Sequence, residues 1–149
     1  MSVTETTRSW HVRLGGPARL AAAALGAGLM VPLVVACLLE PDPRGRGTHQ
    51  QLGLPPCSIV VLFGRPCPTC GMTTAWANVV RGRWAAAFRA HVGGALLCLL
   101  DAAAVPWLLV SAMRGRWLGG AVPGIAGPWI AVVVALVTLV EWIWRLCST

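Results

Sequence analysis

The sequence predicts an all-α fold: a small polytopic membrane helix bundle with three clear transmembrane helices, plus a broken or re-entrant half-helix segment that bears a cysteine motif. Two observations predict this class. The 149 residues are 56% hydrophobic and 11% charged, with a mean hydropathy of +0.70, so much of the apolar surface has to face lipid. The apolar residues also form uncharged runs long enough to cross a bilayer. We therefore expect residues 1–149 to form a single membrane domain whose partner is the lipid bilayer.

The first expected transmembrane helix covers residues 20–39, an uncharged run bracketed by Arg19 and Glu40. At about 1.5 Å per residue, this run matches a hydrocarbon core of about 30 Å. The arginines of residues 1–19 predict a cytoplasmic N-terminus. The end of the run, Val34-Val35-Ala36-Cys37, also resembles the lipobox of a cleaved lipoprotein signal. The length of the run and the two later spans favour an uncleaved helix.

Two further transmembrane helices are expected at residues 92–113 and 125–145. The first is closed by arginine, and the second is entered through a Pro- and Gly-rich stretch. Tryptophans occur near the ends of both runs, where indole rings tend to lie in the membrane interface. Glu141 and Arg145 are four residues apart and are expected to pair at the end of the last helix.

An acidic residue, Asp101, lies near the middle of the second span. An acid at bilayer depth costs roughly 2.5 to 3.5 kcal/mol on insertion scales, so we expect it to face the bundle interior. Its spacing from His91 and Cys98 puts all three on one helix face, which could form a proton or metal path. The plainer interpretation, an acid hydrogen-bonded to a neighbouring helix, is favoured.

The region between the first two spans is expected to hold a loop at residues 40–58 and the broken or re-entrant segment at residues 59–80. An apolar half before Gly64 and a helical half after Cys67 are each too short to span a bilayer, but together they have the length of one broken crossing. The alternative is that residues 52–90 form an amphipathic cap on the membrane surface. Counting arginines on the two sides slightly favours the crossing.

Within this segment, Cys67-Pro68-Thr69-Cys70 resembles the active dithiol of glutaredoxin-like proteins, and Pro68 suits the first position of a helix that starts at Cys67. A helix dipole at that end would favour a thiolate. The same residues also allow a metal site. His49, Cys57, Cys67 and Cys70 supply the four ligands that a closed tetrahedral site for zinc or another thiophilic metal needs.

Several short motifs occur in order between residues 45 and 97: GTH at 47–49, LGLPPC at 52–57, RPCPTCGMTTA at 65–75 and RG at 81–82. This series resembles the bacterial membrane family catalogued as domain of unknown function 2752. The chain departs from the family at His91-Val92, where members often carry an Asn-centred pair. The resemblance implies a small multi-pass helical protein with a cysteine motif, and it implies no reaction.

We expect the protein to be a non-enzymatic binding or assembly protein of a bacterial cytoplasmic membrane, with a structural Cys/His metal site. It could contact other membrane proteins or copies of itself. The alternative is a thiol–disulfide oxidoreductase or redox sensor that uses Cys67 and Cys70, with Cys57 as the resolving thiol. A small transporter or channel component is a third possibility. Nucleic-acid binding is disfavoured, because the arginines stand singly or in pairs at the ends of apolar runs.

Overall fold

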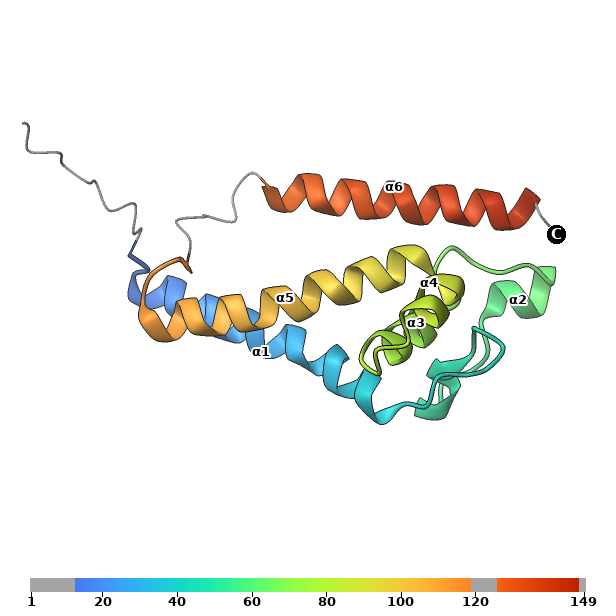
Figure 1. Cartoon of the computed structure of the whole chain (residues 1–149), viewed down its shortest axis with the longest axis horizontal. Coiled ribbons are helices and arrows are strands. Elements are labelled where there is room, and N and C mark those ends of the chain that lie inside the picture. Colours follow the sequence, from blue (N-terminus) through green and yellow to red (C-terminus); the bar gives the residue numbers. More distant parts are fainter. Residues whose placement is uncertain (1–12, 119–125, 148–149) are drawn as a thin grey trace, which may run out of the picture.

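The computed structural model describes residues 13–118 and 126–147 (Figure 1). Its elements are α1 (Gly16–Leu38), the 3-10 helix η1 (Thr48–Leu52), α2 (Ser58–Phe63), α3 (Met72–Val79), α4 (Trp84–Ala90), α5 (Val92–Arg114) and α6 (Ala126–Cys147). Three of them, α1, α5 and α6, are long and apolar enough to cross a membrane. The predicted all-α membrane bundle is therefore confirmed. Most of the expected cytoplasmic segment 1–19, and the expected first residue of the last span, Ile125, lie outside the described residues.

The long helices α1 and α5 pack against each other as an antiparallel pair (Figure 1). At one end, Arg19 of α1 donates hydrogen bonds to the carbonyl oxygens of Ala112 (2.9 Å) and Met113 (3.3 Å) in the last turn of α5. At the other end, Arg81 donates to the carbonyl oxygens of Ala36 and Cys37 in the last turn of α1. Helix C-termini leave carbonyl groups without intrahelical partners, so each arginine completes one helix end and fixes it to a neighbouring element.

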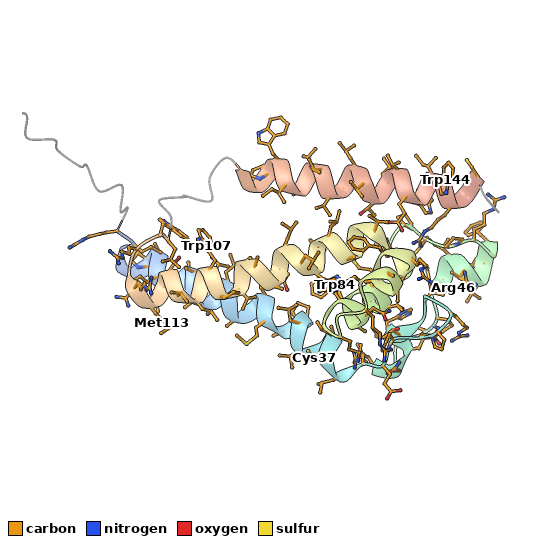
Figure 2. The ribbon with its side chains drawn as sticks, viewed as in Figure 1. Cys37, Arg46, Trp84, Trp107, Met113 and Trp144 are labelled. Carbon is orange, nitrogen blue, oxygen red and sulfur yellow. The ribbon has the colours of Figure 1, made fainter. Side chains whose placement is uncertain are left out.

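Because α1 and α5 run antiparallel, residues 40–91 begin and end at the same end of this pair. The labelled side chains agree with this arrangement (Figure 2). Arg46, from the region between α1 and α5, lies at one end of the molecule together with Trp144, whereas Trp107 and Met113 lie at the opposite end. A single crossing by residues 59–80 would instead require α1 and α5 to run parallel. The arrangement favours a segment that stays on one side of the membrane or re-enters it.

Residues 40–91, which we call the connecting region, pack as short helices around the first turns of α5. Residues 59–80 hold α2 and α3, and α4 follows where no element was expected. The shared core is made of small side chains, including Ala75, Ala87 and Ala95, each with no exposed surface. Small residues let helix backbones approach closely, which is the usual way that helices associate within a membrane.

The last helix, α6, lies along α5 (Figure 1). A Cβ atom on Gly93 would collide with the Thr138 side chain, so the two helices approach closely at this glycine. Glu141 accepts a hydrogen bond from the Gly93 N–H (3.2 Å) and pairs with Arg145, as its spacing predicts. These contacts fix the C-terminal half of α6 beside the start of α5.

Candidate metal centre

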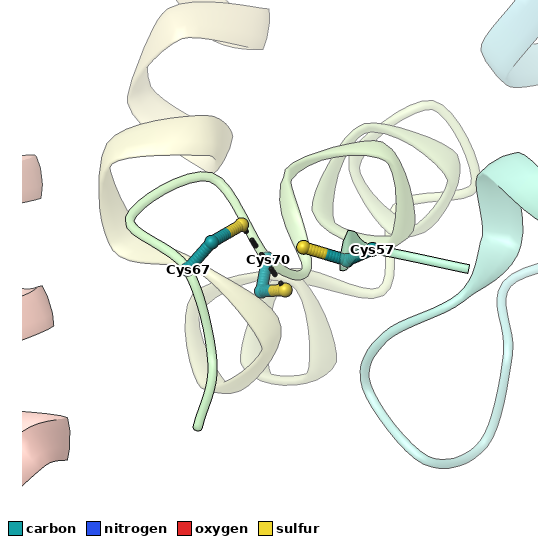
Figure 3. Close-up of side chains that lie close together, drawn as sticks. All are labelled: Cys57, Cys67 and Cys70. Carbon is teal, nitrogen blue, oxygen red and sulfur yellow. Dashed lines mark hydrogen bonds between the residues drawn. The ribbon is translucent and has the colours of Figure 1, made fainter. Parts of the chain in front are cut away.

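Three cysteines from two neighbouring turns come together at the edge of the connecting region (Figure 3). Cys57 is the residue before α2, and Cys67 and Cys70 flank the turn that precedes α3. The three Sγ atoms all lie within 4.8 Å of one another, and those of Cys67 and Cys70 are 3.2 Å apart. The structure thus brings together three of the four residues predicted as metal ligands. His49 lies on η1 and is not a member of this group.

The turn that carries Cys67 and Cys70 differs from the expected helix. The Cys70 N–H donates to the Cys67 carbonyl (3.0 Å), and α3 begins only at Met72. The prediction that a helix starts at Cys67 is therefore wrong. The reason is Gly71, whose φ of +96° ends the turn, and whose Cβ position lies 2.5 Å from the Ala90 carbonyl oxygen. Only glycine combines this backbone conformation with this close approach.

The backbone of the cysteine turn is held by side chains from distant parts of the chain. Every second carbonyl from residue 66 to residue 70 has such a partner: Trp142 Nε1 at 2.9 Å from Pro66 O, His91 Nε2 at 2.7 Å from Pro68 O, and Arg145 Nη1 at 3.1 Å from Cys70 O. Arg145 also donates to the Ala90 carbonyl oxygen at 2.6 Å. We call these three side chains the carbonyl clamp. The clamp fixes the loop from outside and leaves its sulfur atoms free to bind.

His91 joins α5 to the cysteine turn through both of its ring nitrogens. This side chain is 1% exposed and caps α5, where its Nδ1 accepts from the Gly94 N–H at 2.9 Å. Its Nε2 faces the Pro68 carbonyl, which can only accept, so Nε2 carries the proton. Glu141 Oε2 lies 3.3 Å from the same Nδ1. Through these two hydrogen bonds His91 holds the cysteine turn against the first turn of α5.

The two thiols of the turn differ in acidity. Burial raises the pKa of the Cys67 thiol, but hydrogen bonds from the Thr69 hydroxyl and from the Cys70 and Cys57 thiols outweigh it and lower the pKa to about 7 from the ordinary 9.0. Burial, and the hydrogen bond to Cys67, raise the pKa of Cys70 to about 12. Near neutral pH the negative charge of the pair therefore resides on Cys67. The side-chain hydrogen bonds, not an adjoining helix N-terminus, cause this.

The other predicted candidates lie elsewhere. Cys98 and Asp101 are buried on α5, as expected for an inward face. The Oδ2 atom of Asp101 has no hydrogen-bond partner among the described residues, which contradicts the expectation of an acid bonded to a neighbouring helix. The sequence reasoning missed the clamp. The sequence predicts other roles for His91 and Arg145, and no local pattern connects them to a turn that precedes them by at least 20 residues.

The cysteine turn, α3, α4 and the first part of α5 lie in one segment that a family model matches. Residues 57–105 match the sequence model of the family described as Protein of unknown function (DUF2752). The expected family resemblance is confirmed. The match covers about a third of the 149 residues. This DUF2752 segment includes all three clustered cysteines and His91, whereas Trp142 and Arg145 lie outside it. No curated protein and no solved structure matches the chain.

Proposed function

We propose that this membrane protein binds a thiophilic metal ion, zinc above all, at Cys57, Cys67 and Cys70, and that it acts as a binding or assembly protein, not as an enzyme. The observation that carries the proposal is the grouping of three Sγ atoms within 4.8 Å. Thiolates are the preferred ligands of zinc and of other soft metals. Without a metal, the three thiols could form only weak hydrogen bonds with one another, which would stabilise the fold little.

The sulfur positions fit such an ion. Two sulfurs that each lie about 2.3 Å from zinc are about 3.8 Å apart in a tetrahedral site. The 3.2 Å between Cys67 and Cys70 and the 4.8 Å limit of the group fall on either side of that value. If side-chain rotations moved each Sγ atom by less than about 1 Å, the three sulfurs could bind one central ion. The carbonyl clamp holds the backbone of the turn in place while the sulfur atoms move toward the ion.

The fourth coordination position distinguishes this proposal from a closed structural site. The predicted fourth ligand, His49, is not part of the group. Three protein ligands leave one position for water, for a ligand from a partner protein, or for His49 after a movement of η1. Sites with an open position accept exogenous ligands, whereas closed four-ligand sites do not. This supports a role in binding or assembly, with a metal that a second molecule can reach.

The distribution of arginine supports a cytoplasmic location for the cysteine end. Among the described residues, seven arginines lie in the connecting region or near the end of α6, at positions 44, 46, 65, 81, 83, 89 and 145. Four lie at the opposite end, at positions 13, 19, 114 and 116. The side richer in arginine is usually cytoplasmic. The cytosol keeps thiols reduced, which favours metal binding over a stable disulfide. This orientation would place the first residues of α1 outside, the reverse of the orientation predicted from the sequence.

A second candidate, thiol–disulfide exchange, is favoured by the acidity of the pair. Cys67, with a pKa of about 7, has the properties of an attacking thiol. Cys70, whose Sγ is 3.2 Å away, is then the resolving thiol, in the place for which the sequence suggested Cys57. In such a reaction the Cys67 thiolate attacks a disulfide of a partner and releases one partner thiol. Cys70 then displaces the second, and the protein is left with a Cys67–Cys70 disulfide.

Elemental analysis and thiol counting on one sample separate the two candidates. The protein is purified in detergent under reducing conditions without chelator, and we expect about one metal ion per chain. Cys67→Ser and Cys70→Ser should each abolish metal binding. Cys147→Ser, an exposed cysteine outside the group, is the matched control and should retain the metal. His49→Ala tests the fourth ligand, since loss of affinity would add His49 to the site. A metal-free protein with a reversible Cys67–Cys70 disulfide would overturn the metal proposal.

A further inference from the structure

A second pocket lies in the connecting region, and none of the clustered cysteines lines it. It has a volume of about 480 Å³ and lies between the loop that follows α1 and one side of α4. The loop contributes residues 41–45, and Asn78 at the end of α3 also lines the pocket. The volume falls within the roughly 300 to 1,000 Å³ of typical small-molecule sites. We call this feature the arginine pocket.

The charged residues that line the arginine pocket are three arginines and one acid. Arg44 is paired with Asp42: its Nη2 donates to Oδ2 at 2.7 Å, and its Nε donates to Oδ1 at 3.1 Å. This pair has no net charge. Arg83 and Arg89 are exposed, and neither side chain makes a hydrogen bond or an ion pair within the described residues. The pocket therefore presents two positive charges that no described acid neutralises.

The two unpaired arginines lie on the same side of α4, with a small residue between them. Arg83 immediately precedes the helix, and Ala86 and Arg89 follow at intervals of three residues. This spacing keeps all three within about a third of the helix circumference, and it separates the two arginine Cα atoms by about 9 Å along the axis. The methyl side chain of Ala86 leaves the space between them open. One ligand can therefore contact both guanidinium groups.

We propose that the arginine pocket binds a phosphate monoester through Arg83 and Arg89. A guanidinium group presents a planar set of N–H donors that matches the oxygens of phosphate or carboxylate in pairs. A phosphate monoester carries a charge of about −1.5 to −2 near pH 7 and has three acceptor oxygens, so it can bind two guanidinium groups and balance both charges. A carboxylate has two oxygens and a single charge, and would balance only one arginine.

Two sources could supply this group, a lipid headgroup or a soluble phosphate ester, and the position of the pocket suits the lipid. The membrane-spanning helix α1 ends at Leu38, and the lining of the pocket begins at Pro41. Lipid headgroups begin where such a helix leaves the hydrocarbon core. Trp84 and Phe88, on the side of α4 opposite the arginines, are 51% and 37% exposed. Exposed tryptophans are typical of the membrane interface.

The test measures lipid binding to the full chain in neutral detergent micelles by native mass spectrometry over a series of lipid concentrations. The probes are phosphatidic acid, a phosphate monoester, and phosphatidylglycerol, a singly charged diester with the same acyl chains. We expect phosphatidylglycerol to bind at least about fivefold more weakly, because it balances only one of the two arginines. Arg83→Gln and Arg89→Gln should each weaken the binding of phosphatidic acid roughly tenfold, since each removes a charge-assisted hydrogen bond.

Arg65→Gln is the matched control, because it removes the same charge from an exposed arginine of the connecting region that does not line the pocket. It should leave the binding of phosphatidic acid unchanged. An equal loss in Arg65→Gln, or equal binding of the two lipids, would overturn the proposal. Either result would mean that anionic lipid is attracted only to the overall charge of this end of the molecule.

Glycerol 3-phosphate, the headgroup of phosphatidic acid without its acyl chains, distinguishes the two sources. If it displaces phosphatidic acid at comparable concentrations, the pocket binds a soluble ester. If it displaces the lipid only at far higher concentrations, the pocket binds the lipid headgroup. Absence of binding by both glycerol 3-phosphate and phosphatidic acid would refute the proposal. None of these results depends on the metal, because no clustered cysteine lines the pocket.

Discussion

Replacing Gly71 with alanine tests whether the cysteine turn is fixed as tightly as its contacts indicate. The added Cβ would lie 2.5 Å from the Ala90 carbonyl oxygen and 2.8 Å from the Gly45 carbonyl oxygen. Ala90 O is itself held by Arg145 at 2.6 Å, so it cannot easily move away. The left-handed backbone costs a non-glycine residue about 1 to 2 kcal/mol, and overpacking costs about 1 to 3 kcal/mol. We expect Gly71→Ala to lower the free energy of unfolding by about 2 to 5 kcal/mol.

Gly64 provides the matched control. Its φ is also positive, at +64°, but a Cβ there meets nothing within 4 Å. Gly64→Ala should therefore cost only the backbone part, about 1 to 2 kcal/mol. Asparagine tolerates the left-handed region better than alanine does. Gly64→Asn should thus be nearly neutral, whereas Gly71→Asn should remain destabilising because it keeps the Cβ.

The assay is equilibrium unfolding in mixed micelles, followed by the near-ultraviolet circular dichroism of the tryptophans, with metal content measured on the same samples. Gly71→Ala should lose both stability and metal, and Gly64→Ala should keep its metal. Equal destabilisation by the two alanine variants would refute the reasoning. It would mean that the turn can move away from Ala90 and that the close approach places no constraint on the cysteines.

Two further outcomes follow from the arrangement of the helices and the acidity of the thiols. Reporter fusions after Gly45 and Ala85 should report the same side of the membrane, and a fusion after Leu118 the opposite side; opposite signals at 45 and 85 would restore the broken crossing. In metal-free protein, alkylation of Cys67, located by fragment-ion mass spectrometry, should reach half its maximal rate near pH 7, because its pKa is lowered to about 7 and the thiolate is the reactive form. Thr69→Val, which removes the hydroxyl donor, should move that midpoint upward, and an unchanged midpoint would contradict the assigned cause.

The apolar runs were sufficient to predict the three long helices, because helix length and composition are local properties and the bilayer thickness sets a fixed requirement. The direction of α5 relative to α1 was not predictable in the same way. Segment 59–80 has the apolar length of a crossing. The antiparallel arrangement is visible only in tertiary contacts, such as those of Arg19 with Ala112 and of the Leu14 N–H with the Gly115 carbonyl.

The cysteine site was predictable to the extent that its chemistry is local. The CPTCG motif indicated paired thiols, and the nearby Cys57 joins them. The conformation of the turn depends on Gly71, which two carbonyl groups from other segments approach closely, so helix-start rules applied to Pro68 gave the wrong boundary. A sequence also offers no measure of whether η1 brings His49 near the thiols. Such placement depends on tertiary packing, which overrides local preference.

The carbonyl clamp sets an order of events during biosynthesis. Trp142 and Arg145 follow their partners on the cysteine turn by 76 and 75 residues. At a synthesis rate of about 5 to 20 residues per second, the ribosome needs roughly 4 to 15 s to add that length. During this interval the three thiols already exist, but two of the three clamped carbonyl groups have no protein donor. Completion of the site is therefore a late event that awaits the insertion of α6, and a nascent chain arrested before residue 142 would present the cysteines on a turn held by His91 alone.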